Sequence, residues 1–173
     1  MELCDIYNEN WEKTGRILNR DDKTQKLTDD EYLLVVGCWI FNSKNQILLT
    51  KRSPEKKFAP NLWENTGGHV ISGETGTEAM ARELAEEIGI LINPDELILF
   101  GKSKNPRYLG MEFALRKDIS LESIKLQPGE TCEVRWVSET EFDTMIQTGQ
   151  LAPSVVSHLA PLREAFNHIL HQK

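Results

Sequence analysis

Three glutamates that lie close together, Glu83, Glu86 and Glu87, are the residues of this chain best suited to chemistry. Their spacing of three and four residues places them side by side on one face of a helix. Like charges at this spacing destabilise a helix by roughly 0.2–0.5 kcal/mol per pair, so folding alone does not explain the arrangement. A hard divalent cation removes the repulsion, because carboxylate oxygens are its preferred ligands. The spacing therefore predicts a Mg²⁺ or Mn²⁺ site and, with it, phosphate chemistry.

The residues around the glutamates predict the helix that must carry them. Thr75 and Glu78 have the spacing of a capping box, and Gly89 supplies a stop signal. Arg82 flanks the acidic residues and can reach Glu86, four positions later. The opposite arc is apolar and consists of Met80, Ala81, Leu84, Ala85 and Ile88. We expect this arc to pack on a sheet and the acidic face to stay uncovered.

Strands are expected before and after this helix. The continuous apolar run at 33–41 predicts a strand buried on both faces, joined in a hairpin to a second strand at 46–51. Residues 21–30 and 53–66 are expected to form loops. Further strands are predicted at 3–7, 14–19, 96–101, 111–115 and 134–137, and helices at 139–147 and 155–172. This order indicates an α/β fold in which a mixed sheet lies between helices.

Length and composition indicate an ordinary globular protein. The 173 residues fit one domain, 1–173, and the net charge of −7 argues against binding extended nucleic acid or a membrane surface. The three cysteines are widely spaced, which argues against zinc and fits a reducing compartment. The N-terminus does not resemble a signal peptide, and no apolar run approaches the ~20 residues of a membrane span. We therefore expect a cytoplasmic protein.

Residues Gly68 to Ile90 resemble the Nudix box. They match every fixed position of its pattern G-x5-E-x7-R-E-U-x-E-E-x-G-U, where U is a bulky apolar residue. The resemblance implies an α/β/α sandwich with a central mixed sheet. It also implies metal-dependent hydrolysis of a diphosphate linkage in a nucleoside diphosphate derivative or a related organic diphosphate.

The resemblance assigns roles to matching residues of the box. Glu83, Glu86 and Glu87 would be catalytic and would ligate Mg²⁺ or Mn²⁺, with the carbonyl oxygen of Gly68 as a further ligand. Arg82 would orient the glutamates, in a pairing that can include Glu74, rather than touch the substrate.

Two acidic residues outside the box are candidates for a further ligand or general base. Glu130, on a predicted loop, is the first choice, and Glu112, on a predicted strand, is the second. Each is also compatible with an ordinary exposed carboxylate. His69, which follows the double glycine, is compatible with a structural hydrogen bond or with a place in the site.

Four residues are candidates for binding the substrate. Lys51 and Arg52 end a predicted strand and can contact phosphate, or they can be surface charges. Trp63 and Tyr108 can stack on a base, and each is also compatible with packing in the core or at its rim. We expect a small-molecule partner and leave the substrate and a possible homodimer open.

Two other functions compete with the hydrolase. The buried hairpin, the strand end at 51–53 and the loop at 56–63 resemble the type 1 isopentenyl-diphosphate isomerase branch, and with the box the resemblance covers roughly residues 3–137. That branch uses a cysteine just before a Gly-His pair. This chain has Gly67 at that position, and a metal-ligating histidine of the isomerases falls on Leu33. Glycine cannot transfer a proton, so we favour the hydrolase. A Nudix-fold module that only binds ligands would be expected to lack the catalytic glutamates.

Overall fold

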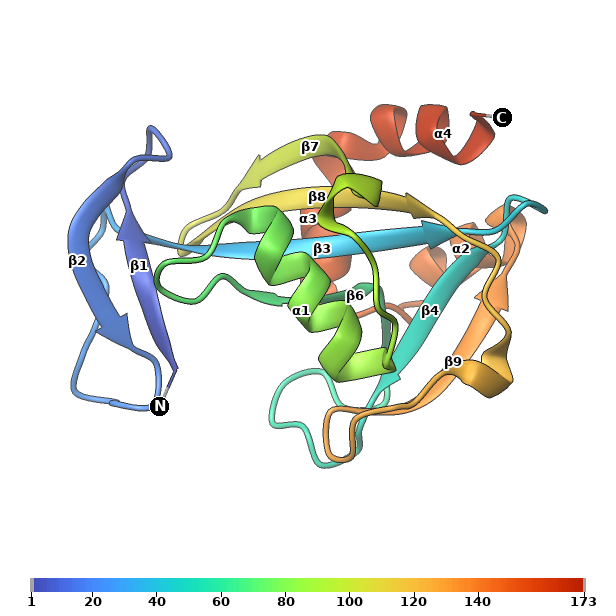
Figure 1. The fold of residues 1–173 in the computed structure, drawn as a ribbon, viewed down its shortest axis with the longest axis horizontal. Coiled ribbons are helices and arrows are strands. Elements are labelled where there is room, and N and C mark those ends of the chain that lie inside the picture. The colour runs from blue at the N-terminus through green and yellow to red at the C-terminus, as the bar shows by residue number, and fades with distance from the viewer. Residues whose placement is uncertain (1, 173) are drawn as a thin grey trace.

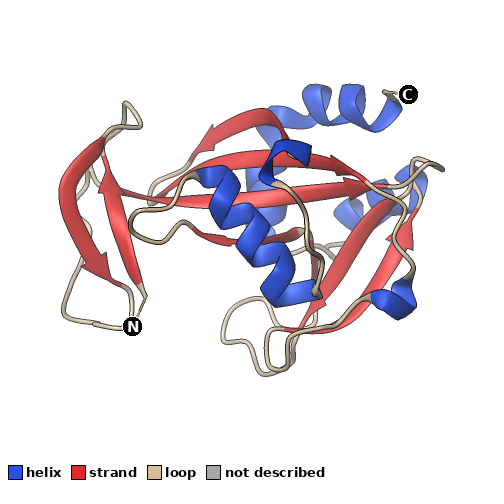
Figure 2. Ribbon diagram, viewed as in Figure 1, coloured by secondary structure: helices blue, strands red, loops and turns tan. Residues whose placement is uncertain are grey.

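The computed structural model describes residues 2–172 and places helices on both faces of a mixed sheet (Figure 1). The strands are β1 (Leu3–Tyr7), β2 (Lys13–Asn19), β3 (Tyr32–Phe41), β4 (Ile47–Arg52), β5 (Trp63–Glu64), β6 (Thr66–His69), β7 (Ile98–Lys104), β8 (Tyr108–Arg116) and β9 (Thr131–Val137). The α-helices are α1 (Gly76–Ile88), α2 (Glu139–Gln147), α3 (Pro153–Leu159) and α4 (Arg163–His171). Figure 2 shows their arrangement around the strands.

Strand β3 organises the sheet. One side of β3 pairs with β8 in parallel over its whole length, and the other side meets β1, β6 and β4 in turn, all antiparallel. The remaining strands extend the sheet outward, since β2 pairs with β1, β7 with β8, and both β5 and β9 with β4. The register places Gly37 of β3 between Glu112 of β8 and Gly67 of β6.

Two hydrophobic clusters cover the two faces of the sheet. Alternate residues of β3 contribute to each, because successive side chains of a strand point in opposite directions. The first cluster lies against α1 and includes Leu34, Val36, Cys38, Ile40, Met80, Leu84 and Ile88. The second lies against α2, α3 and α4 and includes Trp39, Phe41, Phe142 and Phe166. Helix α1 is therefore held on one face of the sheet by its apolar arc.

Several predicted elements are confirmed and others differ. Helix α1 and the long buried strand lie where expected, but the predicted loop at 53–66 already contains β5 and the start of β6. The predicted strand at 96–101 begins at Ile98, because Pro94–Glu96 forms a 3₁₀ turn. The predicted helix at 155–172 is divided by a 3₁₀ turn containing Pro161, which lacks the N–H that a continuous helix needs. Within residues 2–172, no helix combines the length and the apolar character needed to cross a bilayer.

Candidate active site

Helix α1 begins and ends at the residues that its sequence signals mark. The Thr75 hydroxyl accepts a hydrogen bond from the backbone N–H of Glu78, and the Glu78 carboxylate accepts one from the Thr75 N–H at 2.8 Å. Gly89 closes the helix with φ of 71°, a conformation that glycine adopts without strain. The acidic face is less uniform than expected, since the Glu86 side chain is 52% exposed whereas Glu87 is buried.

Arg82 connects the acidic residues to the loop before the helix. Its Nε lies 2.9 Å from Glu74 Oε1, and one terminal nitrogen lies 2.8 Å from Glu83 and 3.2 Å from Glu86. The other terminal nitrogen donates to the His69 carbonyl at 2.9 Å. The hydrogen bond to Glu74 is the main cause that raises the pKa of Arg82. A planar guanidinium can serve several acceptors in fixed directions, so Arg82 sets the orientation of the acidic face.

Glu83 and Gly68 lie in direct proximity where α1 crosses β6. A Cβ atom at Gly68 would overlap the Glu83 carboxylate, so only glycine leaves room for this approach. Burial raises the pKa of Glu83, and the hydrogen bond from Arg82 opposes this rise. The helix and the glycine strand therefore bring the Glu83 carboxylate against the backbone at Gly68.

Glu87 is the most deeply buried acidic residue of the helix. Burial raises its pKa well above the usual range, and the nearby carboxylates, Glu64 first among them, raise it further. The polar backbone of Gly67 favours the ionised carboxylate and partly offsets this rise in the pKa. Glu64 itself receives two hydrogen bonds from Arg52, at 2.9 and 2.7 Å, and burial is the main cause that raises its pKa.

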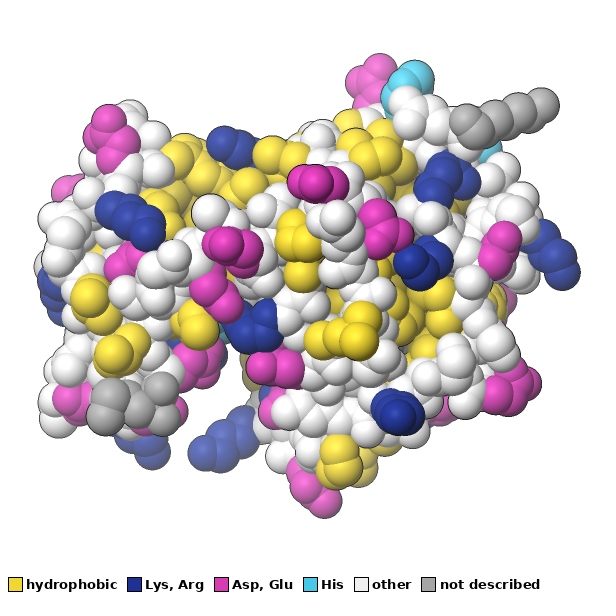
Figure 3. Space-filling view, viewed as in Figure 1, with side chains coloured by type: hydrophobic (Ala, Val, Ile, Leu, Met, Phe, Trp, Pro, Cys, Tyr) yellow, Lys and Arg dark blue, Asp and Glu magenta, His cyan; other side chains and the backbone are white. Residues whose placement is uncertain are grey.

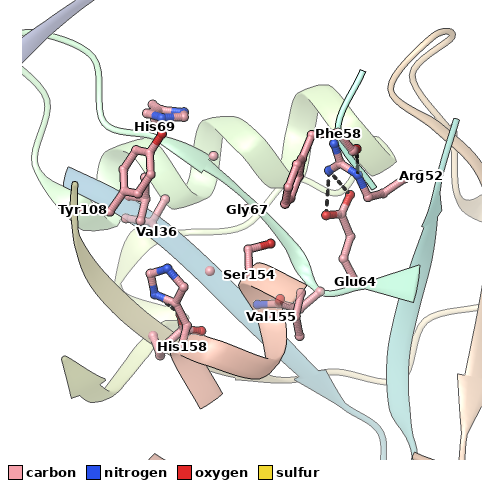
Figure 4. A pocket seen from close by; sticks show the side chains of 15 residues that line it. Val36, Arg52, Phe58, Glu64, Gly67, His69, Tyr108, Ser154, Val155 and His158 are labelled. Carbon is pink, nitrogen blue, oxygen red and sulfur yellow. Dashed lines mark hydrogen bonds and ion pairs between the residues drawn. The ribbon is translucent and has the colours of Figure 1, made fainter. Parts of the chain in front are cut away.

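A cavity of about 420 Å³ opens beside this acidic group, between β3, β6, β8 and α3 (Figure 4). Gly68 and Glu64 belong to its lining, so the cavity adjoins the region of Glu83 and Glu87. Arg52 lines the same end of the cavity as Glu64, with which it forms an ion pair. On the face that carries α1, acidic and basic side chains lie together beside a hollow between the β1–β2 hairpin and the rest of the molecule (Figure 3).

The far part of the cavity contains a buried polar group built around Glu112. Trp39 Nε1 donates to Glu112 Oε2 at 2.9 Å, and His158 Nδ1 lies 3.8 Å from Oε1. Burial raises the pKa of Glu112 to about 7, although the hydrogen bond from Trp39 lowers it. His158 is held by Ser103 Oγ at 2.8 Å and by Asn105 Nδ2 at 2.9 Å, and burial lowers its pKa.

Comparison with known proteins decides the family. A family model described as the NUDIX domain matches residues 31–158. An uncharacterised Nudix hydrolase of Listeria monocytogenes is 34% identical over 159 residues, which span 88% of this chain and 89% of the relative. The chain belongs to the Nudix hydrolase family.

Two further comparisons define the extent of the likeness. The crystal structure of a Deinococcus radiodurans protein superimposes with a TM-score of 0.72 at 26% identity, over 87% of this chain and 92% of the other. An isopentenyl-diphosphate isomerase of Saccharopolyspora erythraea is 36% identical over 88 residues, covering 50% of this chain and 45% of the isomerase. The predicted Nudix fold and the partial resemblance to the isomerase branch are both confirmed.

The metal site expected of a Nudix hydrolase stays a prediction here. Among residues 2–172, no three or more His, Cys, Asp or Glu side chains are grouped closely enough to hold a metal ion. Glu83 and Glu86 are instead both ion-paired with Arg82. The donor set nevertheless suits a hard cation: the oxygens are carboxylates, and Glu87 is buried near other acidic groups. The residues present therefore fit Mg²⁺ or Mn²⁺ by their chemistry.

The candidate substrate-binding residues of this Nudix protein divide into two groups. Arg52 and Tyr108 line the cavity. Lys51 lies outside its lining and pairs with Glu133 at 3.2 Å. Trp63 lies in the second core cluster with 7% of its surface exposed, with the Arg135 guanidinium 4.4 Å from its ring centroid. A ring packed in this way is not available to stack on a base.

The remaining acidic candidates also take different positions. Glu130 forms an ion pair with Lys56 and lies outside the cavity lining, but its charge contributes to the raised pKa of Glu87. Glu112, the second choice, lines the cavity. Sequence reasoning missed Glu64 and His158. The local signal for Glu64 was its place three residues before the double glycine, and His158 had no such signal within its predicted helix.

Proposed function

We propose that this protein hydrolyses a diphosphate linkage in a nucleoside diphosphate derivative or a related organic diphosphate, with Mg²⁺ or Mn²⁺ as cofactor. The observation that carries the proposal is the position of the complete Nudix box next to a cavity. Glu64 lines that cavity and also lies close enough to raise the pKa of Glu87. A substrate in the cavity would therefore present its phosphates to the acidic face of α1.

Each residue has a defined task in this proposal. Glu83, Glu86, Glu87 and the Gly68 carbonyl would hold the cation, which supplies positive charge that stabilises the transition state of phosphoryl transfer. Arg82 keeps the glutamates in place through the contacts that it already makes. Arg52, at the near end of the cavity, offers a guanidinium to a phosphate group of the substrate.

The proposal is tested by incubating the protein with Mg²⁺ or Mn²⁺ and a panel of diphosphates while phosphate-containing products are measured. The panel includes nucleoside triphosphates, nucleotide sugars, dinucleoside polyphosphates and isopentenyl diphosphate. For the best substrate, Glu86→Gln and Glu87→Gln should each lower kcat by about 100-fold or more, because each removes a charged ligand. Glu164→Gln, on α4 across the sheet, is the matched control and should keep its activity.

Three results would count against the proposal. A loss of activity below about tenfold in both glutamine variants would contradict the assigned metal site. Isomerisation of isopentenyl diphosphate without hydrolysis of any panel member would favour the isomerase. Absence of both activity and metal binding would favour a module that only binds ligands.

The geometry at Gly67 argues against the isomerase. A Cβ atom at this position would overlap the backbone carbonyl oxygen of Val36 on the neighbouring strand. Backbone cannot move aside as a flexible side chain can, so a cysteine does not fit here without a shift of β6. With β6 placed as it is in this protein, the position that the isomerase uses for proton transfer leaves no room for a side chain.

A further inference from the structure

The near end of the cavity contains a guanidinium group that keeps part of its hydrogen-bonding capacity unused. Arg52 donates from Nη1 to both carboxylate oxygens of Glu64, at 2.9 and 2.7 Å, and from Nε to the Phe58 carbonyl at 3.0 Å. Within residues 2–172, its other terminal nitrogen, Nη2, forms no hydrogen bond. Figure 4 shows the three residues together at the edge of the cavity that Arg52 lines. The Nη2 group is therefore the part of Arg52 that is left for a ligand.

The two contacts of Arg52 fix the plane of its guanidinium. A guanidinium is rigid and carries its N–H groups in set directions, so acceptors on two different nitrogens prevent it from turning. Glu64 holds Nη1, and the Phe58 carbonyl holds Nε. The Arg52 and Glu64 side chains are only 16% and 15% exposed, so water competes little for these contacts. The Nη2 group consequently has one preferred direction before any ligand arrives.

The loop that supplies the Phe58 carbonyl is closed onto Arg52 and carries strain at this carbonyl. The Arg52 N–H donates to the Leu62 carbonyl at 2.9 Å, and the Arg52 carbonyl accepts from the Asn61 N–H at 3.2 Å. Ala59 has φ of 48°, a conformation that a residue with a Cβ atom adopts only at a cost in free energy. This angle orients the peptide plane that contains the Phe58 carbonyl. The strain therefore lies at the group that accepts from Arg52.

A carboxylate at the position of Glu64 is unfavourable for a phosphate site by its charge alone. Among the carboxylates that raise the pKa of Glu87, Glu64 has the largest effect, so it lies near the acidic face of α1. A negative charge at that place repels the phosphates of a substrate. The ion pair with Arg52 gives Glu64 a reason to be there, because it holds the group that attracts the phosphates.

We propose that Glu64 is a positioning residue which, together with the Phe58 carbonyl, holds the Arg52 guanidinium so that its Nη2 group meets a phosphate of the substrate. The inference rests on the proposed function, which places the phosphates between Arg52 and the acidic face of α1. Glu64 acts through Arg52 and touches neither the substrate nor the cation.

The test measures the binding of methylene diphosphonate by calorimetry in the presence of Mg²⁺. This diphosphate analogue has a P–C–P bridge that is not hydrolysed, so the measurement is independent of catalysis. Glu64→Gln should weaken binding about fivefold or more, because the guanidinium loses a charged partner that fixes it. Charge alone predicts the opposite sign, since the variant removes a repulsive carboxylate. Unchanged or tighter binding, or no binding by the wild type at millimolar concentration, would overturn the inference.

A double-mutant cycle then shows whether Glu64 acts through Arg52. Arg52→Lys keeps the positive charge but lacks the planar fork. In this background Glu64→Gln should weaken binding by less than about twofold further, because the guanidinium that Glu64 holds is already absent. A second full loss would mean that Glu64 supports the site in another way and would refute the positioning role. Glu164→Gln, on α4, is the matched control and should bind as the wild type does.

Substitutions at Ala59 test the second contact and do not disturb the ion pair. Ala59→Val should weaken diphosphonate binding, because a branched side chain strongly disfavours the positive φ that directs the Phe58 carbonyl. Ala59→Gly should retain binding, since glycine adopts this φ without strain. Equal binding by the two variants would show that the carbonyl does not help to hold Arg52. This pair keeps the inference testable if Glu64→Gln fails to fold.

Kinetics with the best substrate separate this proposal from the proposed function. Glu64→Gln should raise KM about fivefold or more and change kcat by less than about threefold, as expected for a residue that acts on binding. A fall in kcat as large as that of Glu87→Gln, with KM unchanged, would make Glu64 a cation ligand instead. Diphosphonate binding that depends on Glu64 and Arg52, without hydrolysis of any diphosphate, would refute the proposed function alone. Hydrolysis that is unaffected by Glu64→Gln would refute the positioning role alone.

Discussion

Glu112 is a carboxyl group in a place where its ionised form is disfavoured. Burial raises its pKa from 4.5 to about 7, so the folded protein holds a proton there that the unfolded chain releases. Below the unfolded pKa the group is neutral in both states and does not affect stability. As the pH rises from about 4.5 to 7 its ionisation opposes folding, by roughly 3 kcal/mol at most once the pH exceeds the folded pKa.

Glu112 leads to a prediction about how the stability of the protein depends on pH. Denaturant unfolding of the wild type and of Glu112→Gln should show that the variant gains stability relative to the wild type as the pH rises from about 4.5 to 7. The difference should be constant above that range, because Glu112 is then ionised in both states. A difference that does not change with pH would show that Glu112 ionises normally.

Gly67 gives a second prediction at the level of one residue. Gly67→Cys supplies the side chain used by the isomerases, but its Cβ meets the Val36 carbonyl. We expect a loss of roughly 1–3 kcal/mol in stability, as for other overpacked sites, and no isomerase activity. Denaturant unfolding and an assay with isopentenyl diphosphate check both. Ser123→Cys, on an exposed turn, is the control and should leave stability unchanged.

At the level of elements, α1 depends on its N-terminal cap. Thr75→Ala removes the hydroxyl that accepts from the Glu78 N–H and should cost about 1 kcal/mol of stability. Thr144→Ala, on an exposed position within α2, removes no cap and should change stability by less than about 0.5 kcal/mol. Denaturant midpoints of the two variants give the comparison. Equal effects would mean that the cap does not stabilise α1.

The elements differ in how far the sequence could predict them. The ends of α1 follow from local signals, since Thr75, Glu78 and Gly89 act on backbone groups within one turn. Strand β6 could not be predicted in this way, because Gly67 and Gly68 have little intrinsic tendency to form a strand and are ordered by pairing with β3. Prediction from local pattern also missed the division between α3 and α4, although Pro161 supplied the signal.

At the scale of the molecule, the binding of a metal ion should increase the stability of the folded protein. A cation that binds only the folded state raises its stability by about 2.7 kcal/mol at one hundred times the dissociation constant. We expect Mn²⁺ to raise the melting temperature of the wild type. Glu87→Gln should melt higher than the wild type without metal, because it removes a buried charge near other carboxylates, and should gain little from Mn²⁺. An equal rise in both proteins would place the metal elsewhere.

The candidate site shows why part of the chemistry is not visible in the sequence. Glu83, Glu86 and Glu87 share one helix, so their spacing alone predicts that they lie together. Glu64 joins Glu87, and His158 approaches Glu112, only because the order of strands in the sheet brings distant segments together. Trp63 shows the opposite case. An indole ring suggests stacking on a base, but the position of Trp63 in the sheet buries the ring.

The β1–β2 hairpin lies before the matched residues 31–158, yet it is attached to the Nudix box. Asp5 accepts hydrogen bonds from the Ser72 hydroxyl at 2.8 Å and from the Gly73 N–H at 3.2 Å, and the Leu3 carbonyl accepts one from the Ser72 N–H at 2.7 Å. Strand β1 thus holds the loop that leads into α1 by hydrogen bonds, although β1 lies outside the family motif. A chain shortened to residues 31–158 would keep every fixed position of the box and lose these hydrogen bonds to its entry loop.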